Sequence, residues 1–178
     1  VLQLQHQGEV DMLEETYLKI ISAKTAELFA ASTKVGAILS DMKNKEKEAL
    51  EFYGRNLGLT FQIADDTLDY NSELKIFGKT IGKDFFEGKI TLPVILLFQN
   101  VMSTEKEKLK NIFKKETRSN EDLNFTLNLI RKYNIIKECY RKAEHFINLA
   151  SNSLTVFKDS NEKKVLENLT SFSLGRNF

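Results

Sequence analysis

The sequence predicts an all-α fold. Proline occurs once and glycine eight times in 178 residues, so few positions interrupt a helix. Apolar residues recur at three- and four-residue steps over nearly the whole chain, which is the spacing of amphipathic helices. No two short alternating segments are joined by a hairpin turn, so the sequence gives no sign of strands. We therefore expect a single helical domain over residues 1–178.

Apolar periodicity and boundary residues place the individual helices. The first helix carries Ile21 and Leu28 on one stripe, and in the second Gly54 and Gly58 lie one turn apart, where a neighbouring helix could approach closely. Proline is tolerated in the first turn of a helix, so Thr91-Leu-Pro93 begins another. The predicted helices span about 13–39, 45–70, 91 onward, 105–115, 121–133, 135–156 and 161–173.

Local signals refine two of these boundaries and leave one long irregular segment. Thr104-Glu-Lys-Glu107 and Ser119-Asn-Glu-Asp122 have the pattern of capping boxes, so each should begin a helix. Residues 71–89 form the long loop of the predicted fold. Loops of this length inside a compact domain are usually functional or disordered.

Charge and cysteine content exclude several classes of protein. Lysine and arginine total 26 against 25 acidic residues, so the net charge of +1 gives no global attraction to nucleic acid or an acidic membrane. Apolar runs are far shorter than the roughly 20 residues of a membrane span, and no signal peptide is visible. The single cysteine rules out an internal disulfide and fits a reducing compartment, so we expect a cytoplasmic protein.

Three aspartates, Asp65, Asp66 and Asp69, lie at the end of the second predicted helix. Asp65 and Asp69 project from one face of a helix, and Asp66 lies about 100° around it. Their charges repel one another, and both the apolar flank and the helix dipole disfavour anions there. A hard cation relieves this repulsion, and magnesium binds one or two carboxylates together with phosphate oxygens and water. The spacing indicates a magnesium site; a solvated acidic helix end is the alternative.

A glycine-punctuated segment with three lysines follows the aspartates. Lys79, Lys83 and Lys89 fall within eleven residues, among Gly78, Gly82 and Gly88. Ammonium groups and the backbone N–H groups of such a loop can converge on one anion, and lysine is well suited to phosphate. Taken alone, the segment could be a solvated loop. Directly after the aspartates, it favours magnesium-dependent diphosphate chemistry.

Three polar residues on the first two helices are further candidates. Lys24 interrupts an apolar stripe, where a charge needs a partner, and the neighbouring Thr25 could donate a hydrogen bond to an anion or line a cavity. A lysine whose aliphatic stem packs on the core is the alternative. Gln62 lies one turn before the aspartates and is ambiguous in the same way.

The remaining reactive residues favour structural roles. His6 and His145 are far apart and have no metal-ligand spacing. Cys139 has no neighbouring histidine or asparagine that would suggest a nucleophile, so we expect a small buried residue. Basic residues are interleaved with acidic ones and do not alternate with aromatics, so the sequence lacks a nucleic-acid-binding pattern.

Taken together, these motifs resemble those of the trans-polyprenyl diphosphate synthases. The matching segments are Lys24-Thr25, Phe-Gln-Ile-x-Asp-Asp-x-x-Asp-Tyr at 61–70, and Gly-Lys-x-x-Gly-x-Asp-x-x-x-Gly-Lys-x-Thr-Leu-Pro at 78–93. The likeness covers essentially the whole chain and is strongest to the octaprenyl-type, long-chain bacterial enzymes that make quinone side chains. It implies the C-terminal portion of an all-α isoprenoid-synthase helical bundle. It also implies a prenyltransferase that condenses isopentenyl diphosphate onto an allylic diphosphate.

The resemblance implies a metal site built on the aspartates. Asp65 would be the main direct magnesium ligand, and Asp66 and Asp69 would complete the shell or orient waters. Asp84 matches a loop acid that helps to position the metal and its waters. Manganese suits the same oxygen ligands, so the sequence leaves the choice of metal open.

The resemblance also implies substrate-binding residues. Lys24 and Lys79 would hold the allylic diphosphate, and Lys89 would lie close to it. Thr25 and Gln62 would stabilise the allylic cation near the reacting carbon. In the family's reaction the allylic C–O bond ionises, isopentenyl diphosphate attacks the cation, and a proton is lost to the diphosphate. Stabilisation of the departing anion supplies the catalysis.

Other parts of the family pattern do not occur in the sequence. There is no first aspartate-rich motif, no arginine pair after it, and no Lys/Arg/His set for isopentenyl diphosphate. The chain opens at Val1 without a methionine, on residues that resemble the tail of a helix. We therefore expect a C-terminal half that is inactive alone. An N-terminal half or a second subunit would complete it, and the complete enzyme is expected to be a homodimer.

Three other interpretations stay open at this stage. The chain could be a non-catalytic regulatory subunit of a heteromeric prenyl synthase, the decayed fragment of a split gene, or a helical interaction module unrelated to isoprenoids. The intact aspartates and loop lysines speak against a purely structural role, which does not require them. An aspartate-rich segment followed by paired arginines in the upstream reading frame would favour the split or truncated enzyme.

Overall fold

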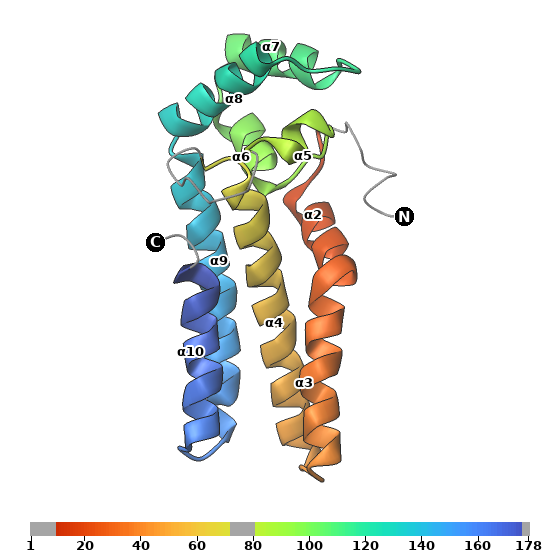
Figure 1. Cartoon of the computed structure of the whole chain (residues 1–178), viewed down its shortest axis with the longest axis vertical. Helices are drawn as coiled ribbons and strands as arrows, with labels where there is room; N and C mark the ends of the chain where they lie inside the picture. The colour runs from red at the N-terminus through yellow and green to blue at the C-terminus, as the bar shows by residue number, and fades with distance from the viewer. Residues whose placement is uncertain (1–9, 72–80, 176–178) are drawn as a thin grey trace. The chain divides into compact units, whose positions relative to one another are not determined.

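The computed structural model describes residues 10–71 and 81–175, and every regular element in them is helical, which confirms the predicted fold class. The chain divides into two compact units, residues 1–20 with 65–140 and residues 21–64 with 141–178. No helix in the described ranges is both long and apolar enough to cross a membrane. The elements (Figure 1) are α2 (Glu14–Ile21), η1 (Ser22–Ala26), α3 (Glu27–Leu39), α4 (Asn44–Leu68), α5 (Lys83–Phe86), α6 (Leu92–Asn100), α7 (Ser103–Phe113), α8 (Asn120–Lys132), α9 (Ile135–Ser153), η2 (Leu154–Val156) and α10 (Asn161–Gly175).

The core of the first unit forms around α6. Every residue of this helix from Leu92 to Phe98 is buried, as expected for a helix that is apolar on all sides. Pro93 lies in its first turn, as the sequence predicts. The Phe113 ring of α7 meets Phe98 with ring centroids 5.8 Å apart and Phe85 of α5 at 5.5 Å, both edge to face. These contacts fix α5 against the core of the unit.

The second unit packs α3 and α4 with α9 and α10. Tyr53 and Leu57 of α4 form a buried cluster with Ala150 and Leu154. The Tyr53 hydroxyl donates to the carbonyl of Leu166 at 2.8 Å, which joins α4 to α10. Figure 1 shows α3 beside α4, and α9 beside α10.

The two glycines of α4 bring α3 into close contact, as their spacing predicts. A Cβ atom added at Gly58 would lie 2.7 Å from Ala26 Cα, and one at Gly54 would clash with the Phe29 carbonyl. Only the absence of side chains at these positions allows the two backbones to approach so closely.

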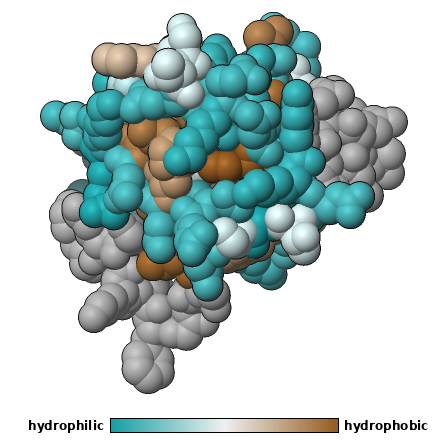
Figure 2. Space-filling view, turned by 90° about the horizontal axis from the view of Figure 1, so that it is seen from above, coloured by the Kyte–Doolittle hydropathy of each residue, from teal (hydrophilic) through white to brown (hydrophobic). Residues whose placement is uncertain are grey.

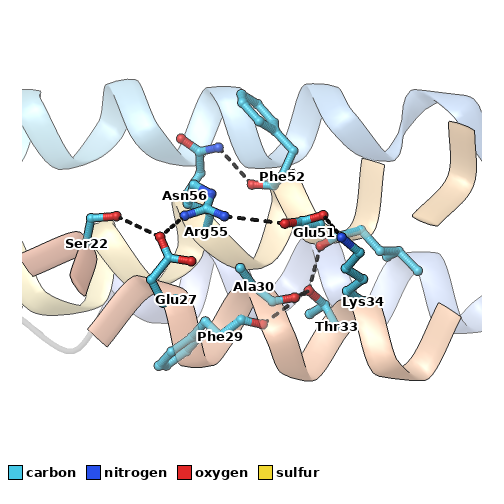
Figure 3. A network of polar contacts seen from close by, with 11 residues as sticks. Ser22, Glu27, Phe29, Ala30, Thr33, Lys34, Glu51, Phe52, Arg55 and Asn56 are labelled. Carbon is cyan, nitrogen blue, oxygen red and sulfur yellow. Dashed lines mark hydrogen bonds and ion pairs between the residues drawn. The ribbon is translucent and has the colours of Figure 1, made fainter. Parts of the chain in front are cut away.

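Polar groups line the same helix pair (Figure 3). Arg55 of α4 lies between Glu27 of α3 and Glu51 and bonds to both. Lys34 pairs with Glu51 at 2.6 Å. The Thr33 hydroxyl donates to the Leu50 carbonyl at 2.6 Å, so the α3–α4 contact has hydrogen bonds as well as close packing.

The first predicted helix departs from a uniform α-helix at Ser22–Ala26, which is a π-helical turn. The Glu27 N–H donates to the carbonyl of Ser22, five residues earlier. The wider turn contains an extra residue and rotates everything after it about the helix axis. The predicted stripe was therefore wrong at Leu28, which is 72% exposed, whereas Ala26 and Ala30 are buried.

Two other local predictions differ from the structure. The helix predicted over about 105–115, with a capping box from Thr104 to Glu107, spans Ser103–Phe113 instead. Its N-terminal hydrogen bond runs from the Met102 N–H to Glu105 Oε2. The Ser119–Asp122 capping box is confirmed, with both reciprocal hydrogen bonds present.

The segment predicted as a long loop contains the short helix α5. This helix starts after Gly82, which has a left-handed conformation with φ of 82°.

Replacement of Gly58 by alanine tests the close α3–α4 contact. We expect Gly58→Ala to lower the free energy of unfolding by about 1–3 kcal/mol, because the added methyl must displace the backbone at Ala26. Gly36→Ala in α3 is the matched control, since nothing lies within 4 Å of its added Cβ. The control should gain up to about 1 kcal/mol from helix propensity. Urea denaturation of both variants checks this, and equal effects would contradict the packing.

Candidate functional site

The three aspartates occupy different environments at the end of α4. Asp65 is exposed, whereas Asp66 and Asp69 are each only 5% exposed. The buried hydroxyl of Tyr17 in α2 donates to Asp66 Oδ2 at 2.7 Å. Burial, followed by the charge and hydrogen bond of Asp66, raises the pKa of Tyr17 well above its ordinary value. The phenol therefore keeps its proton and remains a donor to the carboxylate.

The Asp69 carboxylate contacts the backbone at the start of α5. Its Oδ2 accepts from the N–H of Asp84 at 2.8 Å, and its Oδ1 accepts from the N–H of Lys83 at 3.2 Å. The Asp69 carbonyl also accepts from the N–H of Gly82 at 2.9 Å. Asp69 thus joins the end of α4 to the segment that carries Asp84.

Asp84 and Lys89 form an ion pair on that segment. Lys89 Nζ lies 2.9 Å from Asp84 Oδ1 and 2.6 Å from Glu87 Oε2. Burial by itself would lower the pKa of Lys89, but the hydrogen bonds to Asp84 and Glu87 outweigh it and raise the pKa above its ordinary range. Lys89 is therefore a permanent, partly buried cation beside two carboxylates.

Thr25 and Gln62 form a second pair, within the other unit. The Thr25 hydroxyl donates to Gln62 Oε1 at 2.7 Å, and Gln62 is buried. Lys24 and Thr25 both lie in the π-helical turn, a feature that occurs often at functional sites. Lys24 is exposed, and Lys79 lies outside the described residues.

The geometry limits how a metal could bind. Within residues 10–71 and 81–175, no three Asp, Glu, His or Cys side chains are grouped so as to hold a metal ion by themselves. Magnesium usually takes only one or two carboxylates and completes its octahedron with water and phosphate oxygens. Asp65 is exposed and the adjacent Asp66 is buried, so a cation bound at Asp65 would take its other ligands from water or phosphate.

Sequence reasoning missed Tyr17 and Glu87, the partners of Asp66 and Lys89. Tyr17 is 49 residues from Asp66. The sequence could indicate its role only through the polar hydroxyl that it places on an otherwise apolar stripe of its helix. The expectation of a small buried residue is confirmed for Cys139, where burial raises the thiol pKa to about 12. His145 is exposed, and His6 lies outside the described residues.

The family model described as "Polyprenyl synthetase" matches residues 1–130. The chain belongs to the polyprenyl synthetase family. It is 34% identical over 176 residues to an all-trans-nonaprenyl-diphosphate synthase (geranyl-diphosphate specific) of Rhodobacter capsulatus, covering 99% of this chain and 53% of that protein. An octaprenyl diphosphate synthase of Escherichia coli is 44% identical over 95 residues, which are 53% of this chain and 29% of that one.

Solved structures of polyprenyl synthetases share the fold. A polyprenyl synthase of Caulobacter crescentus CB15, complexed with calcium and isoprenyl diphosphate, superposes with a TM-score of 0.93 at 34% identity, covering 99% of this chain and 54% of that one. A decaprenyl diphosphate synthase of Rhodobacter capsulatus gives a TM-score of 0.92 at 32% identity, with 99% and 55% covered. The chain thus spans about half the length of the relatives that it matches throughout.

Tyr17→Phe tests the hydrogen bond to Asp66. We expect the free energy of unfolding to fall by about 2 kcal/mol, because the buried carboxylate loses a donor. Tyr53→Phe is the control, since that hydroxyl donates to a neutral carbonyl and its loss should cost only about 1 kcal/mol. Chemical denaturation of both variants gives the comparison. A smaller cost at Tyr17 than at Tyr53 would argue against the charged partner.

Proposed function

We propose that this chain supplies the magnesium- and diphosphate-binding part of a long-chain polyprenyl diphosphate synthase. The complete enzyme would condense isopentenyl diphosphate onto an allylic diphosphate to make the prenyl chain of a quinone. The observation that carries the proposal is the bonding of Asp69 to the backbone of Lys83 and Asp84, followed by the Asp84–Lys89 ion pair. This arrangement connects the aspartates at the end of α4 with the Lys89 cation within one unit.

The proposed metal site is centred on Asp65. This side chain is exposed, whereas the Asp66 carboxylate is held by Tyr17. Asp66 and Asp69 would complete the cluster or orient water around it, and Asp84 would help to position the same water. When bound, magnesium or manganese would neutralise diphosphate oxygens and stabilise the leaving group. The calcium and isoprenyl diphosphate in the Caulobacter polyprenyl synthase support a divalent cation with this class of ligand.

The proposed diphosphate contacts come from lysine. Lys89 remains charged because of Asp84 and Glu87, and it would lie beside the departing diphosphate. Lys24 and Lys79 would hold the allylic diphosphate. A cation that carries its charge permanently stabilises a developing anion without a proton transfer.

Thr25 and Gln62 would act on the allylic carbon. The Thr25 hydroxyl donates a hydrogen bond to Gln62 Oε1 in the structure, so its own oxygen lone pairs can face a positive charge. Oxygen dipoles fixed in this way would stabilise an allylic cation without forming a covalent bond to it.

A partner would cover apolar surface on the second unit. Leu28, Val35 and Leu39 of α3 recur at seven and four residues and are 72%, 51% and 80% exposed. On α10, Val165 and Phe172 are 57% and 62% exposed. The face shown in Figure 2 is, by contrast, mostly hydrophilic, with separate hydrophobic patches. Exposed apolar stripes are typical of interaction surfaces, and we propose an N-terminal half or second subunit as the occupant.

Incorporation of labelled isopentenyl diphosphate onto farnesyl diphosphate, with magnesium present, tests the proposed activity. We expect no product from the chain alone and product after co-expression with its upstream coding segment, because the relatives are about twice as long. Activity of the chain alone would contradict the need for a partner. No activity in either case would favour a regulatory subunit or a decayed fragment.

Substitution in the active combination tests the site. We expect Asp65→Ala to lower kcat at least about 100-fold, since it removes the main proposed metal ligand. His145→Ala changes an exposed residue of α9 and should leave kcat within about two-fold. The reverse ranking in steady-state kinetics would overturn the site assignment.

A further inference from the structure

We propose that Arg118 is a positioning residue for the Lys89 cation. Its guanidinium would hold the turn at Gly88, from which Lys89 extends, so that the ammonium group is fixed for the diphosphate. This inference rests on the proposed function of Lys89 and adds to the site a residue that lies outside its sequence motifs.

Lys89 directly follows the tight ending of α5. The N–H of Gly88 donates to the Phe85 carbonyl at 3.1 Å, and the N–H of Lys89 donates to the Asp84 carbonyl at 2.9 Å. Gly88 has a left-handed φ of 72°. This pair of hydrogen bonds around a left-handed glycine is the Schellman arrangement that ends many helices. The backbone position of Lys89 therefore depends on the shape of the turn at Gly88.

The Arg118 guanidinium packs against this turn. A Cβ atom added at Gly88 would lie 3.1 Å from both Arg118 Nη1 and Arg118 Nη2, so a side chain there would press on the guanidinium. Nη1 also lies 3.5 Å from the Phe86 carbonyl, at the long limit of a hydrogen bond. Arg118 thus contacts the end of α5 at two residues, Phe86 and Gly88.

Two aromatic rings and a carbonyl hold the guanidinium in this place. Nη2 of Arg118 donates to the carbonyl of Phe113, the last residue of α7, at 2.7 Å. The guanidinium carbon lies 5.4 Å from the centroid of the Phe113 ring and 5.9 Å from that of Phe85, which are distances of cation–π contacts. Both rings are buried, so Arg118 connects the core of the first unit with the end of α5.

The burial of Arg118 is unusual for its place in the chain. The other residues of 114–119, between α7 and α8, are exposed, whereas Arg118 is half-buried. Its Nε is fully buried and has no hydrogen-bond partner in the part of the chain that the structure describes. Burial of such a nitrogen costs free energy, which the other contacts of the guanidinium must offset. A planar guanidinium can stack on rings and bond to carbonyls at once, which a lysine ammonium cannot do.

Arg118 and the carboxylates act on different parts of Lys89. Asp84 Oδ1 and Glu87 Oε2 lie 2.9 Å and 2.6 Å from Lys89 Nζ, so they hold the ammonium group. Arg118 contacts the turn that precedes Lys89, so it holds the backbone from which the side chain extends. Fixing both ends of a flexible side chain before binding lowers the entropy that an anion must otherwise overcome to order it.

A double-mutant cycle in the 178-residue chain separates positioning from general stability. Arg118→Met removes the guanidinium, Lys89→Met removes the proposed diphosphate contact, and the double variant removes both. Calorimetric titration with inorganic pyrophosphate in the presence of magnesium measures binding by each variant. Because Arg118 is proposed to act through Lys89, its loss should weaken binding only while Lys89 is present.

We expect Lys89→Met to weaken pyrophosphate binding about 10-fold and Arg118→Met about five-fold. The double variant should bind within about two-fold of Lys89→Met alone. Arg118→Lys keeps the charge but lacks the planar fork, so it should bind as weakly as Arg118→Met. Arg131→Met is the matched control, because Arg131 is exposed on α8 and bonds to Asn128 of the same helix. Its loss should change binding less than about two-fold.

Amide hydrogen exchange without any ligand reports the turn itself. We expect Arg118→Met to speed exchange at Gly88 and Lys89 about 10-fold and to leave the buried helix α6 as protected as in the unsubstituted chain. Gly88→Ala should give the same pattern and the same loss of pyrophosphate affinity with Arg118 present. Its methyl group presses on the guanidinium, and alanine disfavours the left-handed φ.

Several results would overturn the proposal. Normal pyrophosphate affinity or unchanged exchange in Arg118→Met would leave the guanidinium no positioning role. Equal losses from Arg118→Met with and without Lys89 would show that it acts independently of Lys89. Full affinity in Arg118→Lys would show that only its charge matters. If the unsubstituted chain bound no pyrophosphate with magnesium, the proposed function itself would fail, and the role of Arg118 in binding would fail with it.

Discussion

Two buried carboxylates beside the C-terminal end of α4 require hydrogen-bond donors from the rest of the first unit. Asp66 and Asp69 lie where the helix dipole disfavours anions, and both are almost fully removed from solvent. Burial of a charge is tolerated only where donors replace the lost water. Tyr17 supplies one donor to Asp66, and the backbone of Lys83 and Asp84 supplies two to Asp69. The placement of α2 and α5 in this unit follows from that requirement as well as from the apolar core.

The hydrogen bonds that stabilise the buried Asp69 carboxylate also position charged side chains. The backbone N–H of Asp84 donates to Asp69, and the Asp84 side chain pairs with Lys89. The segment that stabilises the buried Asp69 charge therefore also holds a lysine cation in place. The net charge of the chain is only +1, and any affinity for diphosphate must come from such local order. Membership in the polyprenyl synthetase family gives this arrangement a chemical context. The chain spans about half the length of the relatives that it matches throughout.

Helical periodicity predicted most of the fold, because the spacing of apolar residues and the helix-capping and helix-breaking residues determine helices locally. The Gly54–Gly58 spacing predicted a close helix contact, and the structure places Ala26 and Phe29 there. Two features could not be predicted in this way. The π-helical turn at Ser22–Ala26 adds a residue to one turn, which no local propensity specifies, and it moved Leu28 to the surface. The first residue of the short helix α5 donates to the Asp69 carboxylate, 14 residues earlier, so the sequence of α5 by itself predicts a loop. The candidate residues were found from their motif, but Tyr17 and the distinct contacts of Asp69 required the three-dimensional structure.

The position of a bound divalent cation would show whether Asp65 is the metal ligand. Crystals of this chain grown with Mn²⁺ and inorganic pyrophosphate would give an anomalous difference peak at the metal, and Mn²⁺ suits the same oxygen ligands as Mg²⁺. We expect a peak at about 2.2 Å from an Asp65 carboxylate oxygen. No peak beside Asp65, or a stronger peak elsewhere in the chain, would contradict this assignment.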